Sequence, residues 1–176
     1  MKRLIFKSLV LIPLLLASLT SSAQEESKSQ NLWDRLVCDA GLSAGLKNNG
    51  MFPTSIYVNL GYKFVPQFYA FANLELVSMK HNTREHGRGE YMVGNALGLG
   101  LGYSLYAKDK KSIDVRGIIG TSVGGFDFYK YTKYDAQLLW KITGKETLGI
   151  GFKHMNSRVE GVKHYNGVYG IVSLDI

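Results

Sequence analysis

Apolar and polar residues alternate along this chain over residues 34–176, and the final segment shows the pattern best. There Val168 and Val172 share one parity, while Tyr169 and Ser173 share the other. Successive residues of a β-strand point to opposite sides, so this spacing predicts a strand whose two faces meet different surroundings.

Interruptions of the alternation divide the chain into eight predicted strands. They cover approximately residues 34–47, 54–64, 67–80, 90–106, 112–124, 128–142, 147–158 and 163–176. Residues typical of turns lie between them, among them Asn48-Asn49-Gly50, Pro66 and Thr143-Gly144. Alternating strands around a closed sheet, with lipid outside, are the pattern of a membrane barrel. The predicted fold class is therefore all-β, a closed eight-stranded antiparallel up-and-down transmembrane β-barrel.

The two parities differ in the same way from strand to strand. One is rich in Leu, Ile, Val and Ala, and the other carries glycines, tyrosines and nearly balanced charges. The charges are Asp39, Glu75, Asp114, Asp135 and Asp175 against Lys63, Arg116, Lys133 and Lys153. Buried charges need partners, so near-balance suits an interior ion-pair network and places the apolar face outside. The alternative is a soluble barrel of the lipocalin kind, which has its apolar face inside.

Small residues and aromatic residues refine this picture. The glycines within residues 97–103 (LGLGLGY) are expected to leave space for Tyr69, Phe71 and Arg116 across the lumen. Five aromatic residues of the apolar parity fall toward one rim, as in an interfacial girdle. They are Tyr62, Phe64, Phe68, Tyr103 and Trp140.

The N-terminal residues predict export. Lys2, Arg3 and Lys7 precede an apolar stretch over residues 9–19, and Ser21-Ser22-Ala23 supplies a cleavage site. The domains expected are a cleaved signal peptide (1–23), a short periplasmic leader (24–33) and the outer-membrane barrel (34–176). Loss of the three basic residues lowers the formal net charge from +7 to +4, too small an excess to favour nucleic acid.

Two further features bound the fold. Cys38 is the single cysteine, so no intramolecular disulfide is expected, and we interpret it as a small lipid-facing residue. Eight strands leave a lumen that side chains fill, which makes a diffusion pore an unexpected function. With the barrel starting in the periplasm, the turns near residues 65–66, 107–111 and 143–145 would face the periplasm. The loops near 48–53, 81–89, 124–127 and 159–161 would face the cell exterior.

The signal peptide, the eight alternating strands and the hydrophobic C-terminal residue together resemble the small outer-membrane barrels of the OmpX and OmpA-barrel kind. Those proteins usually end in Phe, whereas this chain ends in Ile176. The resemblance implies a monomer in the bacterial outer membrane with a structural, envelope or surface-interaction role. Its expected partners are membrane lipid, lipopolysaccharide and, during biogenesis, the outer-membrane assembly machinery. No cofactor, metal or nucleic acid is expected.

The seventh and eighth strands carry the most suggestive polar residues. His154 continues an outward apolar set, and a three-residue hairpin at Val159-Glu160-Gly161 would keep the faces in register. Such a hairpin would place four polar side chains together on the outer surface. It would set His154 opposite Asn166 and Asn156 opposite His164.

An outward His with a small polar residue two positions on is similar to the lipid A deacylases of the PagL type. The resemblance implies that His154 is a general base for ester hydrolysis on lipopolysaccharide. Asn156 stands where the family has its Ser, so Ser157 and Glu160 are the remaining candidates for nucleophile and acid. The alternative is that the apolar band simply ends here, because a tilted strand crosses it in about 9–11 residues.

A second candidate site is the basic loop after the third strand. Lys80, Arg84 and Arg88 could contact lipopolysaccharide phosphates, and the alternative is a solvated loop. The leading prediction is a small outer-membrane barrel with a filled lumen and a structural or surface-interaction role. Lipid A deacylation through His154 is the alternative.

Overall fold

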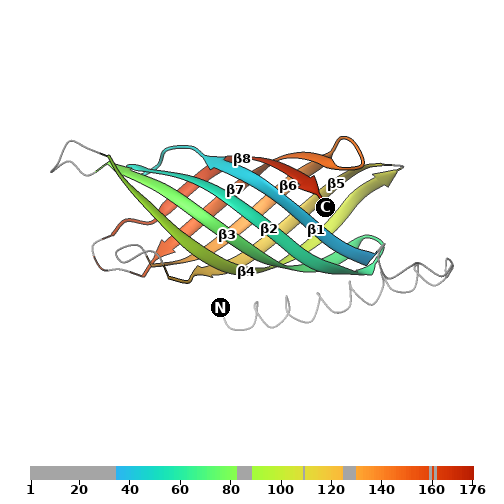
Figure 1. Cartoon of the computed structure of the whole chain (residues 1–176), viewed down its shortest axis with the longest axis horizontal. Coiled ribbons are helices and arrows are strands. Elements are labelled where there is room, and N and C mark those ends of the chain that lie inside the picture. Colours follow the sequence, from blue (N-terminus) through green and yellow to red (C-terminus); the bar gives the residue numbers. More distant parts are fainter. Residues whose placement is uncertain (1–34, 83–88, 109, 125–129, 159, 161) are drawn as a thin grey trace, which may run out of the picture. The chain divides into compact units, whose positions relative to one another are not determined.

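The computed structural model describes residues 35–82, 89–108, 110–124, 130–158, 160 and 162–176. The predicted signal peptide and leader lie outside these residues. Eight strands follow one another in chain order around a closed antiparallel barrel (Figure 1). They are β1 (Leu36–Gly45), β2 (Met51–Val65), β3 (Phe68–Asn82), β4 (Gly89–Lys108), β5 (Lys111–Ser122), β6 (Tyr131–Lys141), β7 (Glu146–Ser157) and β8 (Tyr165–Asp175).

The predicted fold class is confirmed, and each predicted strand overlaps one observed strand. The connections alternate between the two ends of the barrel, which we call the turn end and the loop end. The turn end holds the short connections β2–β3, β4–β5 and β6–β7, and the loop end holds the other four. At the β1–β2 connection, Asn49 and Gly50 have φ of 50° and 82°. This left-handed backbone explains the Asn-Gly pair predicted as a turn.

The strand register sets the width of the barrel. One row of directly opposed residues passes from Asp39 across every strand to Tyr165. Extended through the β8–β1 pairing, the row returns to β1 about ten residues beyond its start. Eight strands with this stagger tilt by roughly 40–45° and enclose a space just wide enough for side chains.

The outer surface of the barrel is apolar and its interior is polar. Leu42 and Leu99 are 58% and 70% exposed, whereas Asp39 and Glu75 are 1% and 5% exposed. The soluble alternative with its apolar face inside is therefore wrong. An apolar belt of this extent around a closed sheet is what lipid contact requires.

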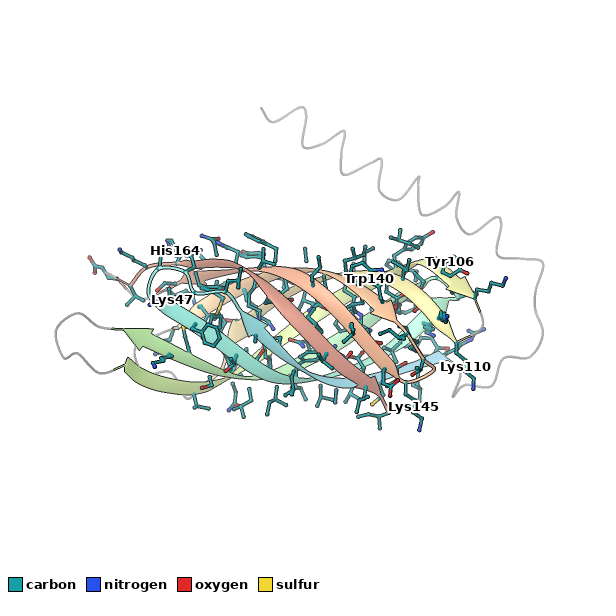
Figure 2. The ribbon with its side chains drawn as sticks, turned by 90° about the horizontal axis from the view of Figure 1, so that it is seen from above. Lys47, Tyr106, Lys110, Trp140, Lys145 and His164 are labelled. Atoms are coloured by element: carbon teal, nitrogen blue, oxygen red, sulfur yellow. The ribbon has the colours of Figure 1, made fainter. Side chains whose placement is uncertain are left out.

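Exposed aromatic side chains gather at the turn end, as predicted. Phe64 packs beside Tyr62 and Phe68, with ring centroids 5.9 and 6.3 Å apart. Figure 2 shows Trp140 and Tyr106 at the same end as Lys110 and Lys145. Tyr106 is 51% exposed and was missed by the sequence analysis.

The polar part of the interior does not reach the loop end, a division that the sequence analysis did not predict. Apolar and tyrosine side chains fill the lumen toward the loop end. They are Met51, Val77, Met79, Ala96, Tyr131, Met155 and Tyr165. These residues have the inward parity, and β2, β3, β6 and β7 also carry polar inward residues nearer the middle, so alternation alone did not separate the two zones.

Glycines of β4 make room for the aromatic side chains of β3, as predicted. A Cβ built on Gly102 would lie 2.6 Å from Tyr69 Oη, and one on Gly100 would lie 2.7 Å from Phe71 Cε1. Tyr69 and Phe71 pack together, and the Arg116 guanidinium lies over both rings at 5.4 and 5.2 Å from their centroids. Gly100 and Gly102 thus leave space for a cluster in which a guanidinium packs on two aromatic rings.

We expect Gly102→Ala to lower the free energy of unfolding by about 1–3 kcal/mol, because the added methyl group overpacks the lumen against Tyr69. The matched control is Gly117→Ala on the outer face of β5, where a Cβ would meet nothing within 4 Å. Urea titration of the refolded protein measures both variants. Equal stability of the two variants would contradict the claim that Tyr69 needs the space left by Gly102.

Candidate functional site

A hydrogen-bonded chain of polar side chains crosses the middle of the lumen. Asn59 Nδ2 donates to Asp39 Oδ1 at 2.9 Å, and Asn73 Nδ2 donates to Asn59 Oδ1 at 2.8 Å. Lys133 Nζ then donates to Asn73 Oδ1 at 2.6 Å. These side chains belong to the same cross-strand row, so the register itself brings them into line.

Two glycines let Lys133 reach its partners. Gly98 and Gly120 stand between Asn73 and Lys133 in that row. A Cβ on Gly120 would lie 2.8 Å from Lys133 Cε, so any other residue there would obstruct the lysine stem. The missing side chains on β4 and β5 allow β6 and β3 to interact across two intervening strands.

Glu75 is the centre of the ion pairs. Its Oε1 accepts from Lys153 Nζ at 2.6 Å, and its Oε2 pairs with Lys133 Nζ. Lys133 also lies 3.6 Å from Asp135 Oδ2. All four side chains are at most 5% exposed, so the charges are compensated inside the protein and not by solvent.

The network continues toward the turn end through Arg116. Its Nη1 lies 3.0 Å from Asp39 Oδ2, and its Nε donates to Tyr69 Oη at 2.8 Å. Tyr69 in turn donates to Asp114 Oδ2 at 3.3 Å. The predicted interior ion-pair network is confirmed for Asp39, Glu75, Asp135, Arg116, Lys133 and Lys153. Asp175 pairs instead with Lys141 at the rim, a partner that the sequence analysis did not name.

On the outer surface, the predicted cluster around His154 is partly present. His154 lies opposite Asn166, and its Nδ1 is hydrogen-bonded to Asn166 Oδ1. The His154 ring also lies beside those of Tyr134 and His164, with centroids 6.0 and 6.2 Å away. Asn156 is the exception, because the pairing of β7 with β8 ends one residue earlier, at Met155 and Tyr165, so Asn156 is not paired with His164.

The predicted three-residue hairpin is wrong. Pairing of β7 with β8 ends at Met155 and Tyr165, so the connection runs over residues 158–164. Beyond the last β7–β8 pair, the backbone N–H of Ser157 donates to His164 Nδ1 at 3.0 Å, while Ser157 stays opposite Tyr131 of β6.

The candidate hydrolytic residues are differently placed. His154 has the outward parity, whereas Ser157 has the parity of the buried Lys153 and Met155. Glu160 lies in the connection beyond β7. The structure thus brings His154 together with Asn166, Tyr134 and His164.

Only part of the basic loop lies within the described residues. Arg84 and Arg88 lie outside the described residues, and Lys80 is a partly buried residue near the end of β3, opposite Phe52 and Tyr91. The described residues contain no group of three or more His, Cys, Asp or Glu side chains arranged to hold a metal ion. No helix among them is long and apolar enough to cross a membrane.

Comparisons with known proteins add little to this description. The chain matches no known protein-family model, and it matches no curated protein. Among solved structures it is similar to the NanC porin in its rhombohedral crystal form. The two are 8% identical over 80% of this chain and 98% of that chain, with a TM-score of 0.30. The class of protein is accordingly defined by the strand pairing and the two faces: a closed eight-stranded barrel with an apolar exterior and a charged, filled interior.

We expect Glu75→Gln to lower the free energy of unfolding by about 3 kcal/mol or more, because two buried ammonium groups would then share the one remaining carboxylate of the cluster, Asp135. The matched control is Asp175→Asn, which removes a carboxylate that is one-third exposed and pairs with Lys141. Its effect should stay below about 1 kcal/mol. Urea titration followed by tryptophan fluorescence measures both, and a smaller loss for Glu75→Gln than for Asp175→Asn would contradict the network.

Proposed function

We propose that this protein is an integral outer-membrane β-barrel with a structural or surface-interaction role, and that its lumen does not conduct solutes. The observation that carries the proposal is the combination of an apolar exterior with a compensated charge network inside. A water-soluble barrel would expose the network and bury the leucines, which is the reverse of this arrangement.

The absence of a pore is proposed from the way the lumen is filled. Lys133, Asn73 and Asn59 form a continuous crossing at mid-height. Toward the loop end, Met79 and Met155 are fully buried and add an apolar layer. A hydrated ion would have to displace both layers, and breaking buried ion pairs is costly.

The turn end and the loop end of the barrel also support a location in the outer membrane. Trp140, Tyr106 and Phe64 mark an interface at the turn end, and the short turns there suit the periplasmic side. Lipopolysaccharide would then contact the loop end, including Lys80, Arg84 and Arg88. We also propose that the protein is a monomer and that the outer-membrane assembly machinery is its partner during biogenesis.

The experiment is expression of the full chain in a Gram-negative cell, followed by fractionation and electrophoresis with and without boiling. We expect the protein in the outer-membrane fraction, with migration that changes on heating because the closed barrel resists detergent unfolding. The purified barrel should give no stable ion conductance in a planar bilayer. A variant with Glu75, Lys133 and Lys153 all changed to Ala is the positive control for an emptied lumen. Recovery in the soluble fraction would refute the location, and steady wild-type conductance would refute the closed lumen.

Lipid A deacylation is a second candidate, supported by one observation. His154 is an imidazole on the outer face, held by Asn166 next to Tyr134. A general base must reach a hydroxyl or water near the ester it attacks. Ser157 and Glu160 would complete the site only by turning toward that face.

For this candidate, mass spectrometry of lipid A from cells with and without the protein should show one fewer acyl chain when the protein is present. His154→Ala should abolish the change, while His164→Ala should leave part of it. An unchanged acyl count would eliminate the activity, and full activity of His154→Ala would eliminate the assigned residue.

A further inference from the structure

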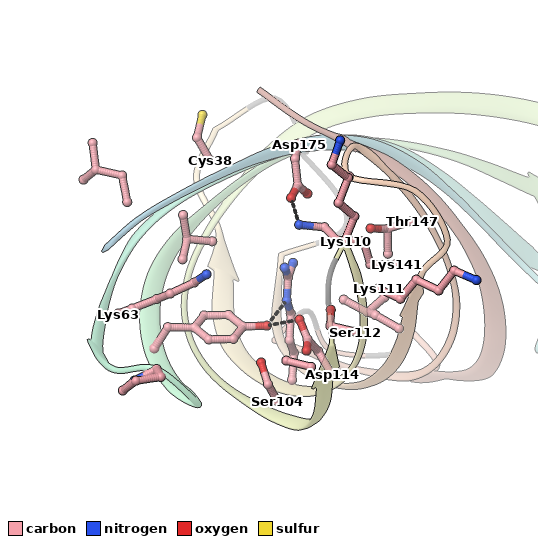
Figure 3. Close-up of a pocket in the computed structure, with 18 of the residues that line it drawn as sticks. Cys38, Lys63, Ser104, Lys110, Lys111, Ser112, Asp114, Lys141, Thr147 and Asp175 are labelled. Atoms are coloured by element: carbon pink, nitrogen blue, oxygen red, sulfur yellow. Dashed lines mark hydrogen bonds and ion pairs between the residues drawn. The ribbon is translucent and has the colours of Figure 1, made fainter. Parts of the chain in front are cut away.

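At the turn end, the lumen opens into a cavity that the ion-pair network does not fill. Its volume is about 370 Å³ (Figure 3). Arg116, Tyr69 and Asp114, the outermost members of the network, line its inner part. Hydroxyl groups of Ser104, Ser112 and Thr147 also line it. We call this cavity the turn-end mouth.

Cations outnumber anions among the side chains that line the turn-end mouth. The lining lysines are Lys63, Lys110, Lys111 and Lys141. Lys141 is paired with Asp175, and Arg116 is paired with Asp39. Within the described part of the chain, Lys63, Lys110 and Lys111 have no ion-pair partner. Asp114 is the one lining side-chain carboxylate without an ion pair there, so the side chains of the mouth carry a positive excess.

Two of the lining residues have the inward parity of their strands and lie next to backbone irregularities. The strand register shifts between Lys63 and Val65 in β2, and between Ser104 and Tyr106 in β4. Both shifts lie at the rim of the mouth. Figure 3 shows the Lys63 ammonium and the Ser104 hydroxyl directed toward the cavity.

Lys110 reaches the mouth from the β4–β5 turn. Its stem lies against the β6–β7 turn at Gly144, where a Cβ would be 3.3 Å from Lys110 Cδ. Lys110 therefore crosses from one turn to the next at the edge of the cavity (Figure 3). Residues from β2, from β4 and from the β4–β5 turn thus line the same cavity.

The donors in the mouth suit one kind of ligand. Lysine ammonium groups are point charges with three donors each, and with serine and threonine hydroxyls they can surround a tetrahedral oxyanion. A planar carboxylate is recognised best by a free guanidinium fork, but Arg116 is already bonded to Asp39 and Tyr69. The positive excess also favours a group that carries more than one negative charge.

We propose that the turn-end mouth binds a phosphate group, supplied either by a phospholipid headgroup or by a soluble phosphate. Trp140 and Tyr106 lie at the same end (Figure 2), so the mouth lies near the level at which lipid phosphates are found. This binding site goes beyond the structural role proposed above, and the two can fail separately.

The test uses the full chain purified in a non-ionic detergent that contains no phosphate. One arm measures binding of inorganic phosphate by calorimetry. The other arm measures retained lipid by native mass spectrometry, after incubation with phosphatidylglycerol or with a galactolipid that has no phosphate. The variant Lys63→Gln with Lys110→Gln removes two lining charges. The matched control, Lys108→Gln with Lys145→Gln, removes two exposed charges at the same end that do not line the cavity.

We expect the lining variant to weaken binding at least tenfold and the control variant to change it less than twofold. Binding of inorganic phosphate identifies a soluble source, and retention of phosphatidylglycerol over galactolipid identifies a lipid headgroup. Failure of both probes to bind wild-type protein overturns the proposal, as does equal weakening in the control variant. Heat-modifiable migration of both variants shows that the barrel is folded, so a loss of binding is not a loss of structure.

Discussion

The compensation of buried charge inside a narrow barrel is the constraint on which this structure depends. Glu75 of β3 accepts from Lys153 of β7 and pairs with Lys133 of β6, so one carboxylate joins strands on opposite walls of the lumen. An uncompensated charge in such surroundings would cost several kcal/mol. The register, the stagger and the small residues of the barrel all have to allow these atoms to meet.

The glycines follow from that constraint. Lys133 can extend along the inner wall because Gly98 and Gly120 leave the intervening strands bare. Tyr69 can lie flat and donate to Asp114 because Gly102 has no side chain. Long polar side chains therefore fit only where neighbouring strands carry glycine. A lumen this narrow cannot hold a large side chain from every strand at the same height.

Much of the fold could be predicted because alternation is a local property. Leu148, Ile150 and Phe152 indicate an outward face without any knowledge of their neighbours, and the balance of inward charges indicates a network. The choice of partners could not be predicted, because Asp39 of β1 meets Arg116 of β5 only through a stagger accumulated over the four strand pairs between them. Likewise, the β7–β8 connection includes a hydrogen bond from the Ser157 N–H to His164, a contact that strand periodicity does not encode.

The charge network has different surroundings at the two ends of the lumen. Toward the loop end it lies under a layer of methionines and tyrosines, where the low dielectric strengthens each ion pair. Toward the turn end it finishes in Arg116, Tyr69 and Asp114 at the inner part of a polar cavity. Water or a solute can approach the network from the turn end, where lysines such as Lys63 are not needed to neutralise it. A barrel that required only internal compensation would have no use for these additional cations, so their concentration around the cavity is the feature of this lumen that stability alone does not explain.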